Sequence, residues 1–319
     1  PDGGATFRTA DAGGVYVSNS EVLIGGEDGL SGGGVGAIRF DEAGEIVDAY
    51  SILTGTRINC AGGATPWGTW LSCEETDEGQ VWECDPFGAV EALVWPALGV
   101  FKHEAVAIDP VRGVAYLTED QEDGRLYRFV PATPAEGRLD FSQGTLQVMQ
   151  VVAGMEGAVV WHDVPDPLAQ SATTRDQVAE STPFDGGEGI WFHDGVIYFS
   201  TKGDNRIWTL DTASETLSIL YDDDTAEDPI LTGVDNVTVS AAGDVLVAED
   251  GGDMQVVAIT AAGDLVPLVQ IEGHDASEIT GPALDPFRGR LYFSSQRGAS
   301  GNILGGDGVT YEISGPFFI

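Results

Sequence analysis

Five residues that can bind metal ions occupy corresponding places in a repeated sequence pattern. A short apolar segment recurs along the chain, and each of these residues lies 10–14 residues before the third residue of one copy. They are Cys60, Glu104, Glu188, Asp235 and Glu278. Carboxylates bind hard cations such as calcium, and a thiolate among them favours a transition metal as well. Because like charges held close together cannot all ionise cheaply, this set predicts a cation site.

A structural role for the same acids is the alternative. About one residue in six of this chain is acidic, so four acids at five corresponding places exceed what chance would give. Acids in the turns of a repeat also accept hydrogen bonds from backbone N–H groups. The spacing leaves both a metal site and turn capping open. In the first copy of the repeat, the nearest acid is Asp11.

Acidic pairs that directly follow the apolar segments are a second candidate set. They are Glu74 with Glu75, Glu119 with Asp120, and Glu249 with Asp250. We expect either a second acidic ring that supports the metal site or solvated loop acids. The pair Glu27 and Asp28 fits the pattern less well, because no comparable motif precedes it.

The basic residues and histidines suggest where an anion would bind. Lys202 is one of only two lysines and follows the fourth apolar segment, where it could bind an anionic substrate. Arg206 and Arg57 are candidate partners, with surface salt bridges as the alternative. His103 adjoins Glu104 and is either a proton donor, a support for that ligand or an ordinary loop histidine. The chain has no HExxH or GxSxG motif, so it indicates neither a zinc hydrolase of that type nor a Ser-His-Asp hydrolase.

The elements that would position these residues form the repeat itself. The apolar segment recurs at 21–29, 69–77, 114–122, 196–204, 244–252 and 290–298. Successive copies lie 45–48 residues apart, except for one gap of 82. A period in the forties with strand-like segments is typical of propellers, whose blades are four-stranded sheets.

We therefore predict an all-β fold, a six-bladed β-propeller that forms a single domain over residues 1–319. The long gap predicts an inserted loop or small subdomain at 132–182, between blades three and four. The C-terminal segment GVTYEIS is expected to complete the sheet of the first blade. Corresponding positions of a propeller surround its axis, so the candidate ligands would converge at one mouth of the channel.

Composition excludes several classes of function. The chain has 14 Lys and Arg against 52 Asp and Glu, which gives a formal charge of −38. Such a protein lacks the cationic surface that nucleic acids and anionic membranes require. No apolar run approaches the ~20 residues needed to span a bilayer. The scarcity of lysine suggests a salt-rich setting, and mutual repulsion favours a monomer.

Three cysteines leave at least one thiol unpaired. If Glu78 and Gly79 form a two-residue turn, Cys73 lies opposite Cys84, and the two could form a disulfide. Cys60 would then be the free thiolate.

Several longer motifs together resemble one family. They are NCAGGATPWGTWLSCEE (59–75), KHEAVAIDP (102–110), YLTED (116–120), GEGIWFHDGVIYFSTKGDNRIW (187–208), VDNVTVS with VAEDGG (234–252) and SEITGPA (277–283). From about residue 55 to the C-terminus, the chain resembles the PhoX-type alkaline phosphatases. The resemblance implies a β-propeller exported to the periplasm or beyond. It also implies hydrolysis of phosphate monoesters, and of some diesters, by a cluster of ferric iron (Fe³⁺) and calcium (Ca²⁺).

The resemblance assigns roles to individual residues. By this resemblance, Cys60 is a ligand of iron. Ligands of iron or calcium would be Glu104, Glu188, Asp235, Glu278, Glu119, Asp120 and Glu249. It implies that Asn59 and Lys202 contact the substrate phosphate. Gly186 stands where better-known members have an arginine, which Lys202, Arg206 or Arg175 could replace. In this reading the metals act as Lewis acids and supply the nucleophile, so no side-chain nucleophile is implied.

Two other hypotheses remain. A calcium-dependent lactonase or esterase with a propeller fold would need one calcium and no thiolate. A non-catalytic scaffold stabilised by calcium would bind the metal and hydrolyse no ester.

Overall fold

The computed structural model describes residues 1–22, 32–133, 137–285, 287–302 and 307–315. Within these ranges the chain forms β-strands, turns and short 3₁₀ helices, with no α-helix. No helix in the described part of the chain is long and apolar enough to cross a membrane. The prediction of an all-β fold is confirmed.

Most strands form antiparallel sheets in which neighbours in sequence are neighbours in space. The first sheet comprises β1 (Gly4–Arg8), β2 (Gly14–Ser20), β3 (Gly33–Phe40) and β4 (Ile46–Thr56). The second comprises β5 (Asn59–Ala64), β6 (Trp70–Glu74), β7 (Val81–Cys84) and β8 (Leu93–Val94). Two later sheets comprise β18 (Val234–Val239), β19 (Val245–Glu249), β20 (Gln255–Ile259) and β21 (Leu265–Gln270), and then β22 (Ile279–Asp285), β23 (Arg290–Ser295) and β24 (Val309–Ser314).

A nine-stranded sheet lies between them along the chain. Its strands are β9 (His103–Asp109), β10 (Val114–Glu119), β11 (Leu126–Pro131), β12 (Gly144–Val151), β13 (Gly157–Asp163), β14 (Gly187–His193), β15 (Val196–Thr201), β16 (Arg206–Asp211) and β17 (Thr216–Asp222). β13 pairs with β12 on one side and with β17 on the other, so it joins two four-stranded meanders. The segment 132–182, predicted as an insertion, contains β12 and β13, and much of it therefore belongs to this sheet. The 3₁₀ helices are η1 (Pro96–Leu98), η2 (Thr174–Asp176) and η3 (Gly298–Ser300).

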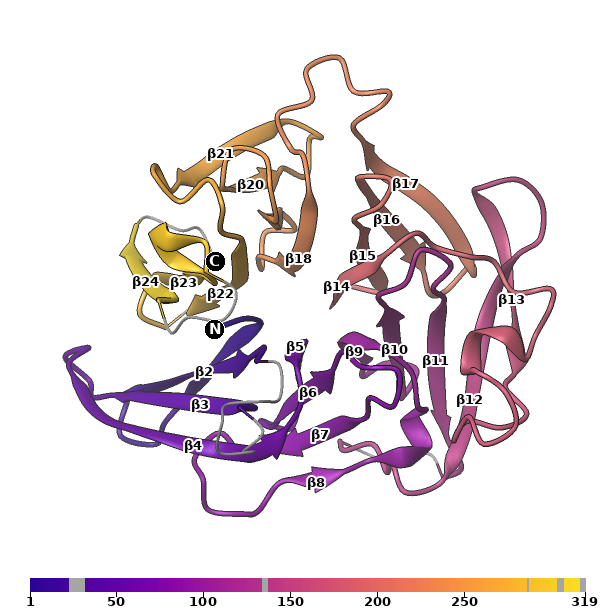
Figure 1. Cartoon of the computed structure of the whole chain (residues 1–319), viewed down its shortest axis with the longest axis horizontal. Coiled ribbons are helices and arrows are strands. Elements are labelled where there is room, and N and C mark those ends of the chain that lie inside the picture. Colours follow the sequence, from indigo (N-terminus) through magenta and orange to yellow (C-terminus); the bar gives the residue numbers. More distant parts are fainter. Residues whose placement is uncertain (23–31, 134–136, 286, 303–306, 316–319) are drawn as a thin grey trace.

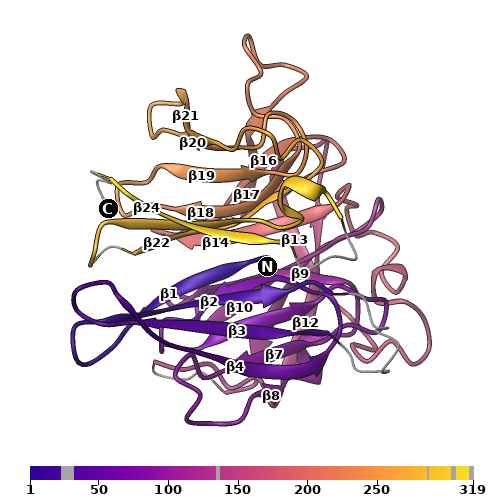
Figure 2. The ribbon, with the colours of Figure 1, turned by 60° about the vertical axis from the view of Figure 1, so that its left-hand side comes forward.

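The sheets surround a central axis in a propeller-like arrangement (Figure 1). The first strand of each meander lies innermost, and these strands contact one another in the order β1, β5, β9, β14, β18, β22. The contact of β22 with β1 brings the last sheet against the first and closes the ring, as the turned view in Figure 2 also shows. Closure of this kind removes most exposed sheet edges from the centre of the molecule.

One sequence expectation about the ends of the ring is wrong. The C-terminal segment GVTYEIS forms β24, which pairs with β23 rather than with the first sheet. The first sheet needs no strand from the C-terminus, because β1–β4 already provide four. Its second strand is β2, whereas most of the segment 21–29, with Glu27 and Asp28, lies outside the described residues.

The expected disulfide is also absent. All three cysteines are buried and free. Cys73 lies opposite Val81, and Cys84 lies opposite Trp70. The connection is wider than a two-residue turn, since the N–H of Glu74 donates to the carbonyl oxygen of Gln80. That wider loop shifts the register by three residues.

Neighbouring sheets pack through apolar side chains. One buried cluster contains Leu71 and Val81 of the second sheet together with Val106, Leu117 and Tyr127 of the nine-stranded sheet. Each such side chain stabilises the fold by roughly 1.5–3 kcal/mol. The hydrophobic core is therefore divided among the interfaces between sheets, and the inner strands line the central axis.

Glycines allow the inner strands to approach closely along the axis. A Cβ on Gly63 would lie 1.8 Å from the carbonyl oxygen of Val106, and one on Gly189 would lie 2.3 Å from the backbone nitrogen of Val237. A volume of about 30 Å³ remains there, lined by residues that include Gly62 and Gly281. The glycines thus leave little free space in the middle of the channel.

Candidate metal centre

Nine side chains with metal-binding atoms gather where the inner strands begin. The structure contains four groups whose ligand atoms lie within 4.8 Å of one another. They are Asp2–Glu21–Cys60, Cys60–Glu75–Glu104, Glu104–Glu188–Asp235 and Asp235–Asp250–Glu278. Because successive groups share a member, we call these nine residues the acidic cluster.

A β-bulge aims each of four cluster residues at the axis. In β5, β9, β14 and β18, two residues oppose a single residue of the neighbouring strand. The first of the two is Cys60, Glu104, Glu188 or Asp235. A bulge redirects a side chain and increases the local twist, and bulges are common beside functional sites. In β22 the corresponding bulge begins at Gly281, so Glu278 reaches the cluster from the residue before the strand.

The backbone carbonyl groups of three of these bulged residues accept hydrogen bonds from side chains of the preceding meander. The donor and acceptor pairs are Asn19 to Cys60, Thr118 to Glu188, and Ser200 to Asp235. All three donor side chains are buried. Hydrogen bonds of this kind restrain the backbone that carries each ligand, so the ligands are positioned before any ion binds.

The acidic pairs separate according to strand alternation. Successive side chains at a strand end point to opposite sides, so one acid of each pair faces the cluster and the other faces the sheet. Glu75 and Asp250 belong to the cluster. Asp120, at the corresponding place after β10, forms a side-chain hydrogen bond with Glu75. The second member of each pair therefore belongs to the cluster or contacts it.

The first member of each pair has partners within the protein. Glu74 accepts hydrogen bonds from the Trp82 indole (3.2 Å) and the Arg57 backbone (3.1 Å). Glu119 accepts one from Tyr127 Oη (2.8 Å) and pairs with Arg175 (3.2 Å). Glu249 accepts backbone N–H groups of two residues, at 2.9 Å each, and these are Thr232 and Gln255.

Two cations contact the cluster. Lys202 Nζ lies 2.5 Å from Asp250 and 3.7 Å from both Glu188 and Asp235. Arg297 lies 2.6 Å from Glu278 and 3.5 Å from Asp250. Among the described residues these are the only basic side chains that form ion pairs with cluster carboxylates. They face eight carboxylates and one thiol, so the cluster as it stands is short of positive charge.

The electrostatics of the cluster reflect this imbalance. Burial raises the pKa of Glu104, and the neighbouring Glu188 raises it further. Burial, with Asp120 and Glu21 nearby, raises the pKa of Glu75 to about 9. The pKa of the Cys60 thiol is raised by burial and by the surrounding carboxylates. A bound cation would stabilise the ionised forms that ligation requires.

Burial alone would lower the pKa of Lys202, but the carboxylates of Asp235, Glu188 and Asp250 raise it. Lys202 is therefore a permanent positive charge inside the cluster.

Three of the residues expected to serve catalysis make contacts with nearby residues of the protein outside the acidic cluster. Asn59 accepts a hydrogen bond from Thr56 and donates one to Ser72. Arg206 pairs with Asp204 (2.5 Å) and Asp222 (2.9 Å).

His103 is fully buried. Its Nε2 lies 3.0 Å from the carbonyl oxygen of Gly99, and its ring centroid lies 3.6 Å from that of Phe101. Burial lowers the pKa of His103 to about 3, so the imidazole is neutral.

Sequence reasoning missed Asp2, Glu21 and Arg297. Asp11, the acid expected from the first copy of the repeat, instead forms an exposed ion pair with Arg39 at 2.8 Å. Glu21 directly follows β2, just as Glu75 directly follows β6, so the correct strand would have revealed it. No sequence signal distinguishes Asp2 or Arg297 from the many other charged residues.

Comparisons with known proteins identify a family for this chain and structures with a similar fold. The family model of alkaline phosphatase PhoX matches residues 25–219. The structure resembles Pseudomonas fluorescens PhoX, solved in complex with vanadate, a transition state analogue, with a TM-score of 0.78 and 18% identity over 98% of this chain and 87% of that one. It also resembles a gluconolactonase from Xanthomonas campestris, with a TM-score of 0.55 and 14% identity over 92% of this chain and 82% of that one. A search of curated proteins finds no match.

The family match covers more than half of the chain and includes Cys60, Glu104 and Glu188. It confirms the resemblance seen in the motifs. The chain therefore belongs to the alkaline phosphatase PhoX family.

Proposed function

We propose that this protein hydrolyses phosphate esters with iron and calcium ions bound by the acidic cluster. One observation carries the proposal. The carboxylate of Glu104 is 1% exposed, and its Oε1 has no hydrogen-bond partner among the described residues, yet it lies within 4.8 Å of two sets of metal-binding atoms. A buried carboxylate in that position is stable when it binds a cation. The donor set fits metal ions of both kinds.

The four groups differ in the ions they suit. Cys60 belongs to two of them, and a thiolate favours iron over calcium. The group Asp235, Asp250 and Glu278 offers oxygen atoms only, as calcium prefers. We assign Fe³⁺ to the side of the cluster near Cys60 and Glu104, and Ca²⁺ to the groups that consist of carboxylates.

The residues of the chain have distinct tasks in the reaction. The bound metals would polarise the phosphoryl oxygens. The phosphorus–oxygen bond to the alcohol breaks as an oxygen atom from water bonds to phosphorus, and the leaving alcohol oxygen takes up a proton. Lys202 and Arg297 stabilise the negative charge that develops on the phosphoryl group. A Cβ on Gly186 would lie 3.7 Å from Cβ of Lys202, so the Gly186 backbone packs directly against Lys202.

The remaining candidates have positioning roles in this proposal. Asp120 extends the cluster beside Glu75. The other five hold strands and loops in place through the contacts described above: Asn59, His103, Glu119, Arg206 and Glu249. Arg206 and His103 then act through neighbouring residues rather than on the phosphate.

We also propose that the nine-stranded sheet represents two blades joined by β13, which would give six blades. Membership of the family supports a periplasmic or secreted location. The charge of −38 supports a monomer that works in salt-rich surroundings and binds small phosphate esters rather than nucleic acid.

The test combines metal analysis with an activity assay. We expect iron and calcium together, at more than one ion per chain, by plasma mass spectrometry, and hydrolysis of p-nitrophenyl phosphate. Glu188→Gln should abolish this turnover with little unfolding, whereas Glu42→Gln, at an exposed acid between β3 and β4, should not.

Activity that survives in Glu188→Gln would contradict the proposal. Calcium alone, without phosphatase activity, would instead favour a lactonase-type enzyme or a scaffold.

A further inference from the structure

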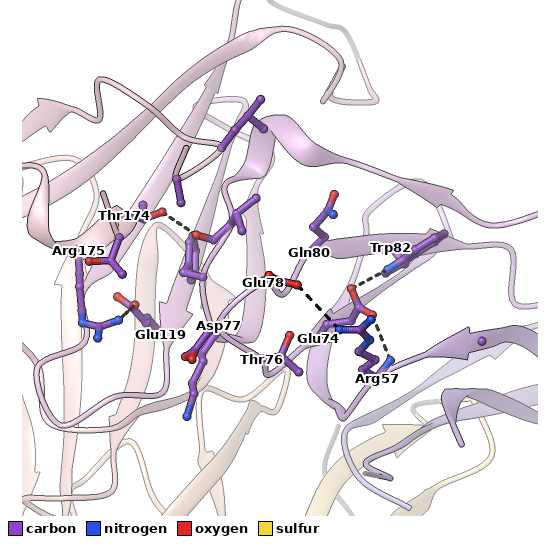
Figure 3. A pocket seen from close by; sticks show the side chains of 17 residues that line it. Arg57, Glu74, Thr76, Asp77, Glu78, Gln80, Trp82, Glu119, Thr174 and Arg175 are labelled. Carbon is purple, nitrogen blue, oxygen red and sulfur yellow. Dashed lines mark hydrogen bonds and ion pairs between the residues drawn. The ribbon is translucent and has the colours of Figure 1, made fainter. Parts of the chain in front are cut away.

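A cavity of about 610 Å³ is lined by side chains from the β6–β7 hairpin, from the segments before β5, β9 and β14, and by Glu119 of β10 (Figure 3). Two residues of its wall are close to cluster residues in sequence. Glu74 precedes the cluster residue Glu75, and Lys102 lies two residues before Glu104. The size suits a small organic molecule.

The outer wall of the cavity is fixed by hydrogen bonds. Leu168, Ala169 and Arg175 line it from a segment that lies between β13 and β14. Thr174 Oγ1 donates to the carbonyl oxygen of Val100 at 2.6 Å. The N–H of Val100 donates to the carbonyl oxygen of Pro167 at 2.9 Å. This segment, part of the predicted insertion, thus gives the cavity a defined shape.

The charges that line the cavity are mostly neutralised by one another. Arg175 pairs with Glu119 at 3.2 Å and with Asp123 at 3.0 Å. Arg57 lies 3.9 Å from Glu78, whose side chain is 86% exposed, and it therefore lies at the lip. Glu74 and Glu119 already accept hydrogen bonds from protein donors.

Lys102 differs from the other basic residues of the cavity. It forms no ion pair with any of the described acidic residues, although the chain has 52 acids for 14 basic residues. The residue is half-buried in the cavity wall. Burial and Asp120 raise the pKa of the cluster residue Glu75, and the charge of Lys102 opposes that rise, so Lys102 lies near the cluster. An ammonium group that forms no close ion pair is available to bind an anion of a ligand.

We propose that this cavity binds the alcohol part of the phosphate ester, and that Lys102 selects substrates whose alcohol carries a second anionic group. A carboxylate or a second phosphate has the required chemistry. This inference rests on the proposed function, because the cluster must bind the first phosphate. Arg57 at the lip would attract the same anionic group as it enters.

The experiment compares two substrates that differ in one group. Phosphoglycerate carries a carboxylate where glycerol phosphate carries a neutral hydroxymethyl group. We expect wild-type protein loaded with metals to favour phosphoglycerate about tenfold or more in kcat/KM, because a hydrogen bond to a charged group contributes ~1.5–3 kcal/mol. Lys102→Gln should bring this ratio close to one through a higher KM for phosphoglycerate. Lys102→Arg should restore part of the ratio.

Arg39→Gln is the matched control, because Arg39 forms its ion pair far along the first sheet from the cavity. Its ratio should equal that of the wild type. A wild-type ratio near one, or a ratio that Lys102→Gln leaves intact, would overturn the inference.

Failure of the proposed function would have a different signature. The wild type would then hydrolyse neither glycerol phosphate nor p-nitrophenyl phosphate. In that case calorimetric titration of metal-loaded protein with phosphoglycerate still tests the cavity. Binding that Lys102→Gln weakens would support the inference, and equal binding by both proteins would contradict it.

Discussion

Glu83 and Glu104 are both buried glutamates, 4% and 1% exposed, but their surroundings differ. Glu83 accepts hydrogen bonds from the indoles of Trp67 and Trp95 and pairs with Arg138 at 3.0 Å. Glu104 lies among other carboxylates, and its Oε1 has no partner within the described chain. Burial alone therefore does not mark a functional acid in this protein.

The two glutamates differ in whether the protein supplies the hydrogen-bond donors and positive charge that balance a buried carboxylate. Around Glu83 the protein supplies it with donors from three elements, so the residue stabilises the interface between them. Around Glu104 the protein supplies too little, and like charges accumulate. A buried acid without donors is costly in the folded protein, and it persists where a ligand completes it.

The largest expected effect follows from replacing Glu104. Glu104→Gln removes a ligand shared by two metal-binding groups, and we expect phosphatase activity to fall at least ~100-fold, since loss of groups that merely support ligands costs ~10–100-fold. The metal-free variant should be at least as stable as the metal-free wild type, because a buried like charge is removed. Thermal unfolding with and without chelator measures both effects.

Replacing Glu83 should have the opposite profile. Glu83→Gln turns an acceptor for several donors into an amide that can accept fewer hydrogen bonds, so we expect a loss of about 1–3 kcal/mol in the free energy of unfolding. Activity per folded molecule should remain near that of the wild type. Denaturant titration and an assay at low temperature separate the two quantities. If Glu83→Gln lost its bound metal, the contrast between these acids would fail.

The metal-free protein should become less stable as pH rises. The pKa of Glu75 is raised to about 9 in the folded protein, and that of Asp235 to about 6, both mainly by burial. The folded state therefore binds more protons than the unfolded state between about pH 4 and 9, and stability falls across that range. Bound metal ions should flatten this dependence. Melting temperatures at several pH values, with and without chelator, provide the measurement.

The smallest expected effect concerns the cysteines. Burial raises the pKa of Cys84 to about 12 and also raises that of Cys73. Both should stay unreactive towards a thiol reagent at pH 8 in the folded protein. After denaturation without a reductant, three thiols per chain should titrate. Recovery of a single thiol would show that Cys73 and Cys84 are bridged.

The sequence predicted the parts of the site that follow the repeat. Cys60, Glu104, Glu188 and Asp235 occupy equivalent bulges, so their spacing was nearly constant. Glu278 precedes its strand and does not occupy a bulge, and it accordingly lies 14 residues before the third residue of its apolar segment, the longest spacing of the five. Sequence analysis selected Glu249 as a metal ligand, whereas the structure places Asp250 in the cluster. Neighbouring residues of a strand point to opposite faces, and which of the two faces the cluster depends on the pairing register, which the sequence does not show.

Other features depend on contacts between distant parts of the chain. Asp2 reaches the cluster because β1 closes the ring against β22, and Arg297 does so because it follows β23. The apolar pattern of β23 carries no information about which acids will surround Arg297. The length of the loop between β6 and β7 likewise determines which residue lies opposite Cys73. The residue types alone did not specify that length.

The glycines leave little free space in the middle of the channel, whereas the acidic cluster lies at one end of the inner strands. Among the described residues, the space between the glycines is about 30 Å³, and the cavity that Glu74 lines measures about 610 Å³. We therefore expect the ester to arrive, and phosphate to leave, at the same end of the channel. Added phosphate should then compete with the ester for the cluster.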